Sequence, residues 1–436
     1  MFNESQSLSG PQGINSKIAE EATFSPDGSG RTKVGKGFLA SYSLAYIGVW
    51  LATLPPTFLT LPLKVNSLVP EGEAAGALGL ILAVGSLCAI LANLIFGNLS
   101  DRTTSRFGMR RPFMLAGIII ALVGAVLMGL APSIPLLLVG FIVAQVGCNA
   151  VLAALFGVLP DQVPAGQRGT VSGIFGISIP VGLVVGAGIV QAVAPNFLLM
   201  FLIPTIVPAI TVTIFLFVLK DRRLEKKDQP AFSLGKFVKN FWISPRKFPD
   251  FGWAWWSRFM FLFANGILQG FQAFYLSDHL HIPQAEIPQA VFMNTLGFSA
   301  FTVLSSVIFG KLSDVTRRRK PFVFIAAVIY GAGLVLAATA GSFPMAVGAW
   351  CVAGVGLGSY LAVDLALATD LLPNPKTPAN DLAVFNIAST LPQIAAPIVA
   401  PIVLAIAMGS YPVLYGVGAL AGVLAALLLI PIKKVR

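Results

Sequence analysis

Charge is scarce in this sequence of 436 residues, because only 11% of them are Asp, Glu, Lys or Arg. A soluble globular domain carries roughly 25% charged residues, so this chain has too few charges to cover a water-exposed surface. Hydrophobic residues make up 56% of the chain, and the mean hydropathy is +0.83. Together with apolar runs along the whole length, these values indicate a polytopic membrane protein.

Histidine and cysteine are also rare, which argues against several kinds of site. The two histidines form a His-x-His pair beside Asp278, and so few candidate ligands are more typical of a solvated turn than of a metal site. The three cysteines lie far apart in apolar segments without metal or redox spacing: Cys88, Cys148 and Cys351. We find no reactive constellation, Walker-type phosphate loop or sizeable soluble domain. We therefore expect neither an enzyme nor a sensor, no metal, and no cofactor beyond a gradient of protons or another cation.

The apolar runs predict an all-α membrane protein with twelve spans, arranged as two six-helix bundles. The spans are expected near residues 38–62, 74–99, 113–132, 134–159, 169–194, 197–219, 251–278, 287–310, 321–341, 343–371, 380–408 and 410–432. Residues 1–36 are polar and rich in Ser and Gly, so we expect a disordered cytoplasmic tail without a cleavable signal peptide. The expected domains are that tail, bundles over 37–219 and 251–436, and a basic cytoplasmic linker over 220–250.

The basic residues predict the orientation of the spans. Of 29 Lys and Arg, all except Lys64 and Arg258 fall in the N-terminal tail, in or beside the connections that follow even-numbered spans, or at the C-terminus. The positive-inside bias then places both termini in the cytoplasm, and we expect the plasma or inner membrane. The net charge of +11 follows from this topology, so no nucleic-acid partner is expected. Within the linker, 232–247 fits an amphipathic helix on an anionic leaflet, or a plain surface linker.

Two charged loops repeat along the chain. GNLSDRTTSRFGMRRPF begins at Gly97, and GKLSDVTRRRKPF begins at Gly310. The connection before the fifth span, which leads to Pro180, has a weaker echo that leads to Pro392. Motifs repeated in the same order indicate a duplicated six-helix unit, an arrangement found in one large class of transporters.

These residues resemble the major facilitator superfamily, over essentially all of residues 37–432. The loop at 97–113 matches that superfamily's signature between its second and third helices. SDRTTSRFGMRRPF looks most like the sucrose–proton symporters and their glycoside-cation relatives. WSRF at 256–259 and DLAVFNIASTLPQ at 381–393 resemble bacterial members of the same group. The resemblance implies alternating access, in which two bundles rock about a central site.

The resemblance also implies a gating role for the charged loop. Asp101 is expected to interact with a helix N-terminus in the facing bundle, with Arg102, Arg106, Arg110 and Arg111 as partners, and Gly97 is expected to let helices approach closely. The alternative is that the arginines only satisfy the positive-inside bias. In the second copy Asp314 is followed by Val315 instead of a basic residue, which suggests a weaker latch there. The candidate gating residues are Gly97, Asp101, Arg102, Arg106, Arg110, Arg111, Gly310 and Asp314.

Polar side chains within the spans are candidates for a substrate site, because the superfamily's cavity is lined chiefly by helices one, four, seven and ten. Amides and aromatic rings suit a neutral polyol, whose hydroxyls need donors and acceptors while its apolar face stacks on rings. The alternative is hydrogen bonding between helices. The candidates are Tyr42, Tyr46, Trp50, Gln145, Asn149, Asn265, Gln269, Gln272, Tyr360, Asn386 and Gln393, with Ser172 and Asn294 as further polar groups.

Asp364 is the only carboxylate placed well inside any predicted span, and Arg258 is the only base. An ionisable residue at membrane depth indicates a functional site. Each lies seven residues from the same face, about 10 Å deep at 1.5 Å per residue, so an ion pair is expected. It is either a static pair or a proton switch. Plant sucrose carriers keep an acidic residue in the fourth helix, where this chain has Gln145 and Asn149, so proton coupling requires a different carboxylate.

The expected function is therefore proton-coupled import of a sugar, glycoside or similar neutral solute by a monomer in the bilayer. The alternative is an exporter of drugs or metabolites. Exporters of the superfamily typically carry an adjacent Gly-Pro in the fifth helix, whereas GISIPVGLVVGAG has Pro180 without it, which favours import.

Overall fold

The structure, a computed structural model, describes residues 34–433 apart from 71, 222, 225–247, 317 and 372–377. Residues 1–33 of the predicted tail and the segment 232–247 lie outside these residues, whereas the last residue of the predicted tail, Lys36, already begins the first helix. The first half comprises α2 (Lys36–Pro55), η2 (Pro56–Thr60), α3 (Leu61–Asn66), α4 (Ala74–Arg102), α5 (Arg111–Leu130), α6 (Ile134–Gln162), α7 (Ala165–Val193) and α8 (Phe197–Val218). The second comprises α10 (Pro249–Gly270), α11 (Gln272–Phe274), η4 (Tyr275–His279), α12 (Ile287–Thr316), α13 (Lys320–Thr339), α14 (Phe343–Asp370), α15 (Pro378–Thr390), α16 (Pro392–Ile406) and α17 (Tyr411–Leu427).

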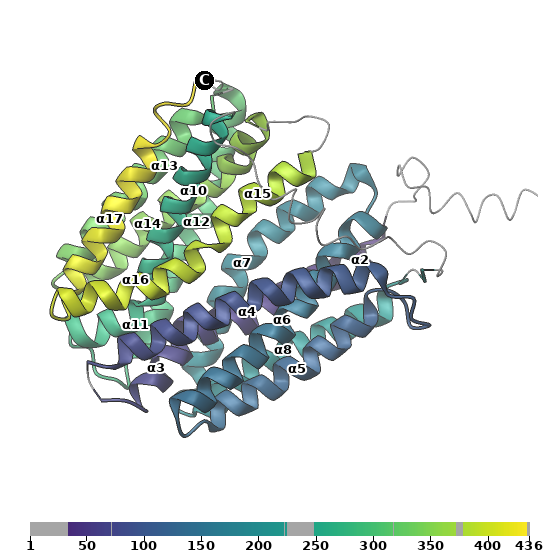
Figure 1. Cartoon of the computed structure of the whole chain (residues 1–436), viewed down its shortest axis with the longest axis horizontal. Helices are drawn as coiled ribbons and strands as arrows, with labels where there is room; N and C mark the ends of the chain where they lie inside the picture. The colour runs from purple at the N-terminus through teal and green to yellow at the C-terminus, as the bar shows by residue number, and fades with distance from the viewer. Residues whose placement is uncertain are drawn as a thin grey trace, which may run out of the picture.

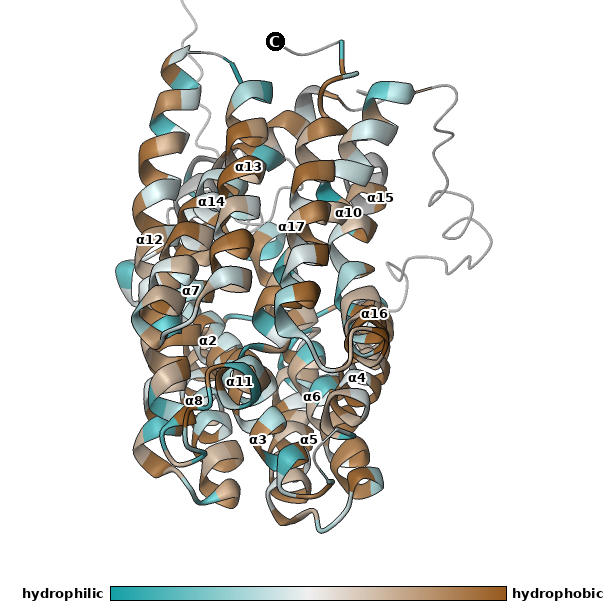
Figure 2. Ribbon diagram, turned by 90° about the vertical axis from the view of Figure 1, so that its left-hand side faces the viewer, coloured by the Kyte–Doolittle hydropathy of each residue, from teal (hydrophilic) through white to brown (hydrophobic). Residues whose placement is uncertain are grey.

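The predicted all-helical membrane fold is confirmed. Within the described residues, 10 helices are long and apolar enough to cross a membrane. The number rises to 11 if α10 and the α11–η4 segment, which meet at a bend of 46°, are counted together as the seventh span. The shorter apolar helix α17 occupies the position of the predicted twelfth span. Apolar residues dominate the ribbons of all these helices in Figure 2.

Proline shapes two of the spans. The first span continues through Pro55 and Pro56 as the π-helical segment η2 instead of ending there. In the eleventh span, a turn at Leu391 separates α15 from α16, which begins at Pro392. Proline lacks the N–H that a regular helix needs, and π-helical turns are one way a helix absorbs such an irregularity. A second π-helical segment, η4, follows the bend in the seventh span.

The helices form two bundles that are in contact at one end and diverge toward the other (Figure 1). The joined end, where α3 and α11 lie, is called the α3 end below. The other end, which carries Asp101 and the end of the described chain, is called the motif end. Across the halves, α4 packs on α16 and α7 packs on α12. A Cβ built at Gly79 would lie 2.3 Å from the Pro397 carbonyl oxygen. The α4–α16 contact therefore requires glycine at this position.

Replacing Gly79 with Leu is expected to open the α3 end. The added side chain would meet backbone, and overpacking costs about 1–3 kcal/mol, which disfavours this arrangement of the bundles. Spin labels at Ser133 and Ser342, exposed residues on opposite halves, should then report a longer distance by electron–electron double resonance. Gly76→Leu is the matched control, because a Cβ there meets nothing within 4 Å. Equal distance distributions in the two variants would rule out this role for Gly79.

Candidate functional site

Arg258 and Asp364 form an ion pair inside the second bundle. Arg258 Nη1, on α10, donates to Asp364 Oδ2, on α14, and the side chains are only 13% and 5% exposed. Arg258 Nε donates to Ser389 Oγ on α15 at 2.6 Å, and the guanidinium carbon lies 4.8 Å from the centroid of the Phe385 ring. A buried pair is tolerated where further polar contacts satisfy its remaining atoms. Three helices of the second half therefore meet at one charge pair.

Ser389 and Phe385 were not among the predicted site residues. They are four apart on α15, so they share a helix face, and a search for i, i+4 partners in DLAVFNIASTLPQ could have found them. Chemically, a proton on Asp364 would remove the charge that holds Arg258, leaving Ser389 as its remaining hydrogen-bond partner. The pair could equally stay ionised as a static link between α10 and α14.

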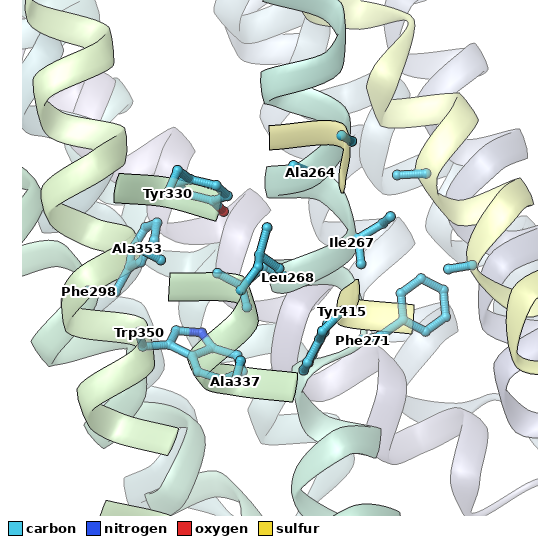
Figure 3. Packing of buried hydrophobic residues seen from close by; sticks show 14 of the residues in the cluster. Ala264, Ile267, Leu268, Phe271, Phe298, Tyr330, Ala337, Trp350, Ala353 and Tyr415 are labelled. Atoms are coloured by element: carbon cyan, nitrogen blue, oxygen red, sulfur yellow. The ribbon is translucent and has the colours of Figure 1, made fainter. Parts of the chain in front are cut away.

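The predicted amides of α10 meet side chains of neighbouring helices. Tyr330 on α13 donates its hydroxyl to Asn265 Oδ1 at 3.0 Å, and Trp350 Nε1 on α14 donates to Gln269 Oε1 at 3.4 Å. Figure 3 shows the Tyr330 and Trp350 rings packed beside this part of α10. The side-chain oxygens of Asn265 and Gln269 therefore accept hydrogen bonds from neighbouring helices. Tyr360 is also packed, with its ring stacked on Phe261 at a centroid distance of 3.8 Å.

Gln272 and Asn294 are buried without a complete set of partners. Gln272 is 2% exposed and Asn294 is fully buried. Within the described part of the chain, Gln272 Oε1 and both side-chain polar atoms of Asn294 have no hydrogen-bond partner. An unsatisfied buried polar group costs about 1–3 kcal/mol, so these atoms are suited to a bound solute or to water.

The aromatic candidates of the first span lie in the core of the first bundle. Tyr42 donates its hydroxyl to the Leu155 carbonyl of α6 at 2.6 Å. Tyr46 stacks on Phe175 of α7 at a centroid distance of 3.9 Å, and the Trp50 ring contacts the Tyr46 ring edge-on at a centroid distance of 6.1 Å. Trp50 Nε1 is buried and has no partner among the described residues. Packing between helices thus occupies Tyr42, whereas Trp50 retains an unused donor.

The remaining polar candidates are Gln145 and Asn149 on α6, Asn386 on α15 and Gln393 on α16. Asn149 donates to the Gln145 carbonyl of its own helix at 2.9 Å, and Gln145 is 9% exposed. Gln393 donates to the Ser389 carbonyl at 3.5 Å, and both Gln393 and Asn386 are exposed.

A Tyr42→Phe variant distinguishes packing from solute binding. Removing a net hydrogen bond costs about 0.5–1.5 kcal/mol and leaves the Leu155 carbonyl short of a donor. We expect a lower thermal midpoint in detergent with an unchanged solute concentration for half-maximal uptake. Tyr415→Phe is the control, because the Tyr415 hydroxyl has no hydrogen-bond partner among the described residues. A changed half-saturation concentration in Tyr42→Phe would indicate solute contact instead.

The charged loop forms a network centred on Arg110. Its guanidinium pairs with Asp101 at 2.6 Å and with Asp161 at 2.9 Å, and it donates to Ser100 Oγ at 3.0 Å. Burial acts to lower the pKa of Arg110, but the Asp161 and Asp101 carboxylates outweigh it and raise that pKa above its usual range. The network joins the motif ends of α4, α5 and α6.

The structure differs from the sequence prediction at two positions of this loop. Asp101 pairs with Arg110, which was among its expected partners, but this residue belongs to its own bundle and not to a helix of the facing bundle. The bundles diverge at this end (Figure 1), which removes the facing helix from reach. A Cβ at Gly97 would meet nothing within 4 Å, so this arrangement involves no close approach there.

The other predicted gating residues make fewer of the contacts described. The Arg106 guanidinium lies 5.1 Å from the centroid of the Phe107 ring, and Arg102 is the last residue of α4. In the second copy, Asp314 is exposed, and a Cβ at Gly310 would contact Ala362 at an ordinary 3.6 Å.

Asp221 anchors the end of the first bundle and was not predicted. Its Oδ2 accepts hydrogen bonds from the backbone N–H groups of Arg110 and Arg111, at 2.8 and 2.9 Å. The carboxylate lies against Gly108, whose positive φ of +104° and missing Cβ make room for it. The Arg111 guanidinium also donates to the Leu219 carbonyl.

The second half has a related arrangement. Lys320 Nζ donates to the carbonyls of Ile430 and Ile432 at 2.9 and 2.7 Å. Asp250, just before the membrane part of α10, accepts a hydrogen bond from the Lys433 N–H at 3.1 Å. Each half therefore ties its last span to an earlier one.

Comparison with protein families gives a match across nearly the whole chain. The model described as Major Facilitator Superfamily matches residues 38–297 and 254–436. Two solved structures share the fold. A D-xylose-proton symporter aligns with a TM-score of 0.66 and 16% identity, over 91% of this chain and 97% of that one. A bacterial homolog of the human lysosomal transporter Spinster, inward-facing and occupied, aligns with a TM-score of 0.65 and 17% identity, over 90% and 94%.

Two curated relatives match parts of the sequence. The general alpha-glucoside permease of Schizosaccharomyces pombe is 32% identical over 123 residues, which are 24% of this chain and 22% of that protein. Multidrug resistance protein 3 of Bacillus subtilis is 30% identical over 123 residues, 27% of this chain and 23% of that protein. These alignments therefore span less than a quarter of either relative.

Proposed function

Because the chain belongs to the Major Facilitator Superfamily and is a multi-pass membrane transporter and not an enzyme, we propose that it imports a neutral polar solute. The solute class is a sugar, a glycoside or a similar polyol, and proton movement drives its uptake. Transport proceeds by alternating access, with the two bundles rocking about a site between them.

The Arg258–Asp364 pair is the observation that carries the proposed coupling. It is a buried ion pair that links α10 to α14. Because a carboxylate at membrane depth is energetically costly, its presence there indicates a functional role. Protonation of Asp364 would free Arg258 and loosen the contact between these helices. Proton binding would thus change the relative stability of two helix arrangements, as coupling requires.

Unpartnered neutral groups support the solute class. Gln272, Asn294 and Trp50 retain buried polar atoms without partners among the described residues. A hydroxyl both donates and accepts, so the hydroxyls of a polyol suit an amide oxygen, an amide nitrogen or an indole N–H. The D-xylose-proton symporter with the same fold and the permease match point to the same class.

The alternative is proton-coupled export of drugs or metabolites. The match to multidrug resistance protein 3 favours it. Against it, the fifth helix has Pro180 without the adjacent Gly-Pro that exporters typically carry. We also propose a monomer in the plasma or inner membrane with both termini in the cytoplasm, because the basic residues gather at the motif end. In that orientation, the end at which the two bundles diverge faces the cytoplasm.

Uptake into proteoliposomes tests the proposed function. An inward proton gradient is imposed, and radiolabelled mono- and disaccharides and polyols are offered in turn. We expect at least one saccharide to accumulate, and dissipation of the gradient with a protonophore to abolish the accumulation. Movement of a lipophilic cation or amphiphile, with no saccharide moved, would establish the exporter alternative.

A further inference from the structure

A polar pocket lies at the α3 end, away from the Arg258–Asp364 pair. Its volume is about 720 Å³, within the roughly 300–1,000 Å³ typical of small-molecule sites. Both halves build it: α3, the end of α7, the start of α8 and their connection come from the first, and the loop before α12 with the first turn of α12 comes from the second. Its polar lining consists of Asn66, Ser67, Gln191, Gln284 and Gln289.

The chemistry of the lining is neutral. None of the described residues that line the pocket carries a charge, and its apolar wall includes Leu63, Phe197 and Met200. Amide side chains offer both donors and acceptors, and a hydroxyl does the same. An apolar wall beside such groups matches a sugar ring, which has hydroxyls at its edge and C–H groups on its face.

Lys64 adds a constraint on charge. It is only 9% exposed, and its ammonium lies 4.8 Å from the centroid of the Phe197 ring. Because Phe197 also lines the pocket, a positive charge lies close behind this wall. Like charges in a weakly screened site repel, so the pocket disfavours a cationic solute.

We propose that this pocket binds a neutral polyhydroxylated solute, a mono- or disaccharide, at a place separate from the Arg258–Asp364 pair. The choice of solute class rests on the proposed function, but the site does not depend on proton coupling. Gln191 belongs to one bundle, and Gln284 and Gln289 belong to the other. A solute held by both stabilises the contact at the α3 end and therefore favours the arrangement in which the motif end is open.

Protection of an introduced thiol tests the site. The full chain carrying Gln284→Cys, in lipid nanodiscs, is labelled with a charged methanethiosulfonate, with D-glucose, sucrose or maltose present. Labelling of the unsubstituted chain corrects for its three cysteines. We expect one saccharide to slow labelling at least about fivefold, as occupancy above 80% of the site would. Ser133→Cys, exposed in another connection at the same end, should label at the same rate with and without saccharide.

A second substitution separates binding from a change of conformation. Adding Gln191→Leu to Gln284→Cys should raise the half-protecting saccharide concentration about tenfold, the effect of one lost hydrogen bond of about 1.4 kcal/mol. An unchanged concentration, or no protection by any saccharide, would overturn the pocket assignment. If a saccharide accumulates in proteoliposomes but does not protect the thiol, the pocket assignment is wrong and the proposed function stands. If a saccharide protects the thiol but none accumulates, the pocket assignment is supported and the proposed function is wrong.

Discussion

Asp364→Asn is expected to abolish gradient-driven accumulation of the solute while leaving exchange of solute across the membrane intact. Asn resembles the protonated carboxylic acid in size and neutrality, so the variant mimics a transporter whose coupling site is permanently loaded. Arg258 keeps its contact with Ser389, and an amide oxygen can still accept from it, although the loss of its counter-charge lowers stability. Loss of one coupled proton at a tenfold gradient removes a driving force of about 1.4 kcal/mol, so the accumulation ratio should fall about tenfold or more. Uptake and counterflow in the same proteoliposomes measure the two activities.

Asp278→Asn is the matched control for this substitution. Asp278 lies in the same bundle and accepts a hydrogen bond from the Tyr411 hydroxyl at 2.9 Å, but it belongs to the α3 end of the seventh span. We expect it to accumulate solute like the unsubstituted chain. If Asp364→Asn accumulates the solute equally well, the pair is static and the proton enters elsewhere. An Arg258→Gln/Asp364→Asn double variant should then still fold, because no charge is left unpaired.

Arg110→Ala is expected to lower the thermal midpoint of the chain by about 5–10 °C. The substitution leaves Asp101 and Asp161 without their shared cation and removes a donor from Ser100. Removing one partner of a buried pair costs about 3–5 kcal/mol, but Asp101 is 56% exposed and water screens it. We therefore expect the free energy of unfolding to fall by about 2–3 kcal/mol. In a domain the size of one bundle, this loss lowers the thermal midpoint by about 5–10 °C.

Fluorescence-detected unfolding in detergent measures this change. Arg106→Ala in the same loop is the control, because its described contact is with the Phe107 ring at the surface, and we expect a shift within about 2 °C. Solute transport by Arg110→Ala should fall as the ends of α4, α5 and α6 separate. An Arg110→Ala chain that unfolds like Arg106→Ala would mean that the network contributes nothing to stability.

The spans were predictable from sequence because hydrocarbon thickness sets the length of an apolar run. The predicted span at 74–99 is observed as Ala74–Arg102, and that at 287–310 as Ile287–Thr316. Both helices continue past the apolar run into the charged motif. Hydropathy marks where lipid contact ends, whereas backbone hydrogen bonding continues in water, so the far ends were underestimated.

The Arg258–Asp364 contact was also predictable, since depth along two helices follows from counting residues. Ser389 and Phe385 were missed because a hydroxyl and a phenyl ring are common inside apolar spans, so neither residue type marks a charge site by itself, although both lie on one face of α15. Arg110 was one of four arginines expected to pair with Asp101. The sequence could not single it out, because all four lie in the same charged loop.

The carboxylates of Asp221 and Asp250 have a mechanical consequence. Asp221 fastens the end of the first bundle to α5, and Asp250 fastens the start of the second to the end of its last helix. Both fastenings close within one half. A displacement of either of these chain ends would therefore act first on the hydrogen bonds of Asp221 and Asp250. Each bundle can therefore rotate as a rigid body about the α4–α16 and α7–α12 contacts.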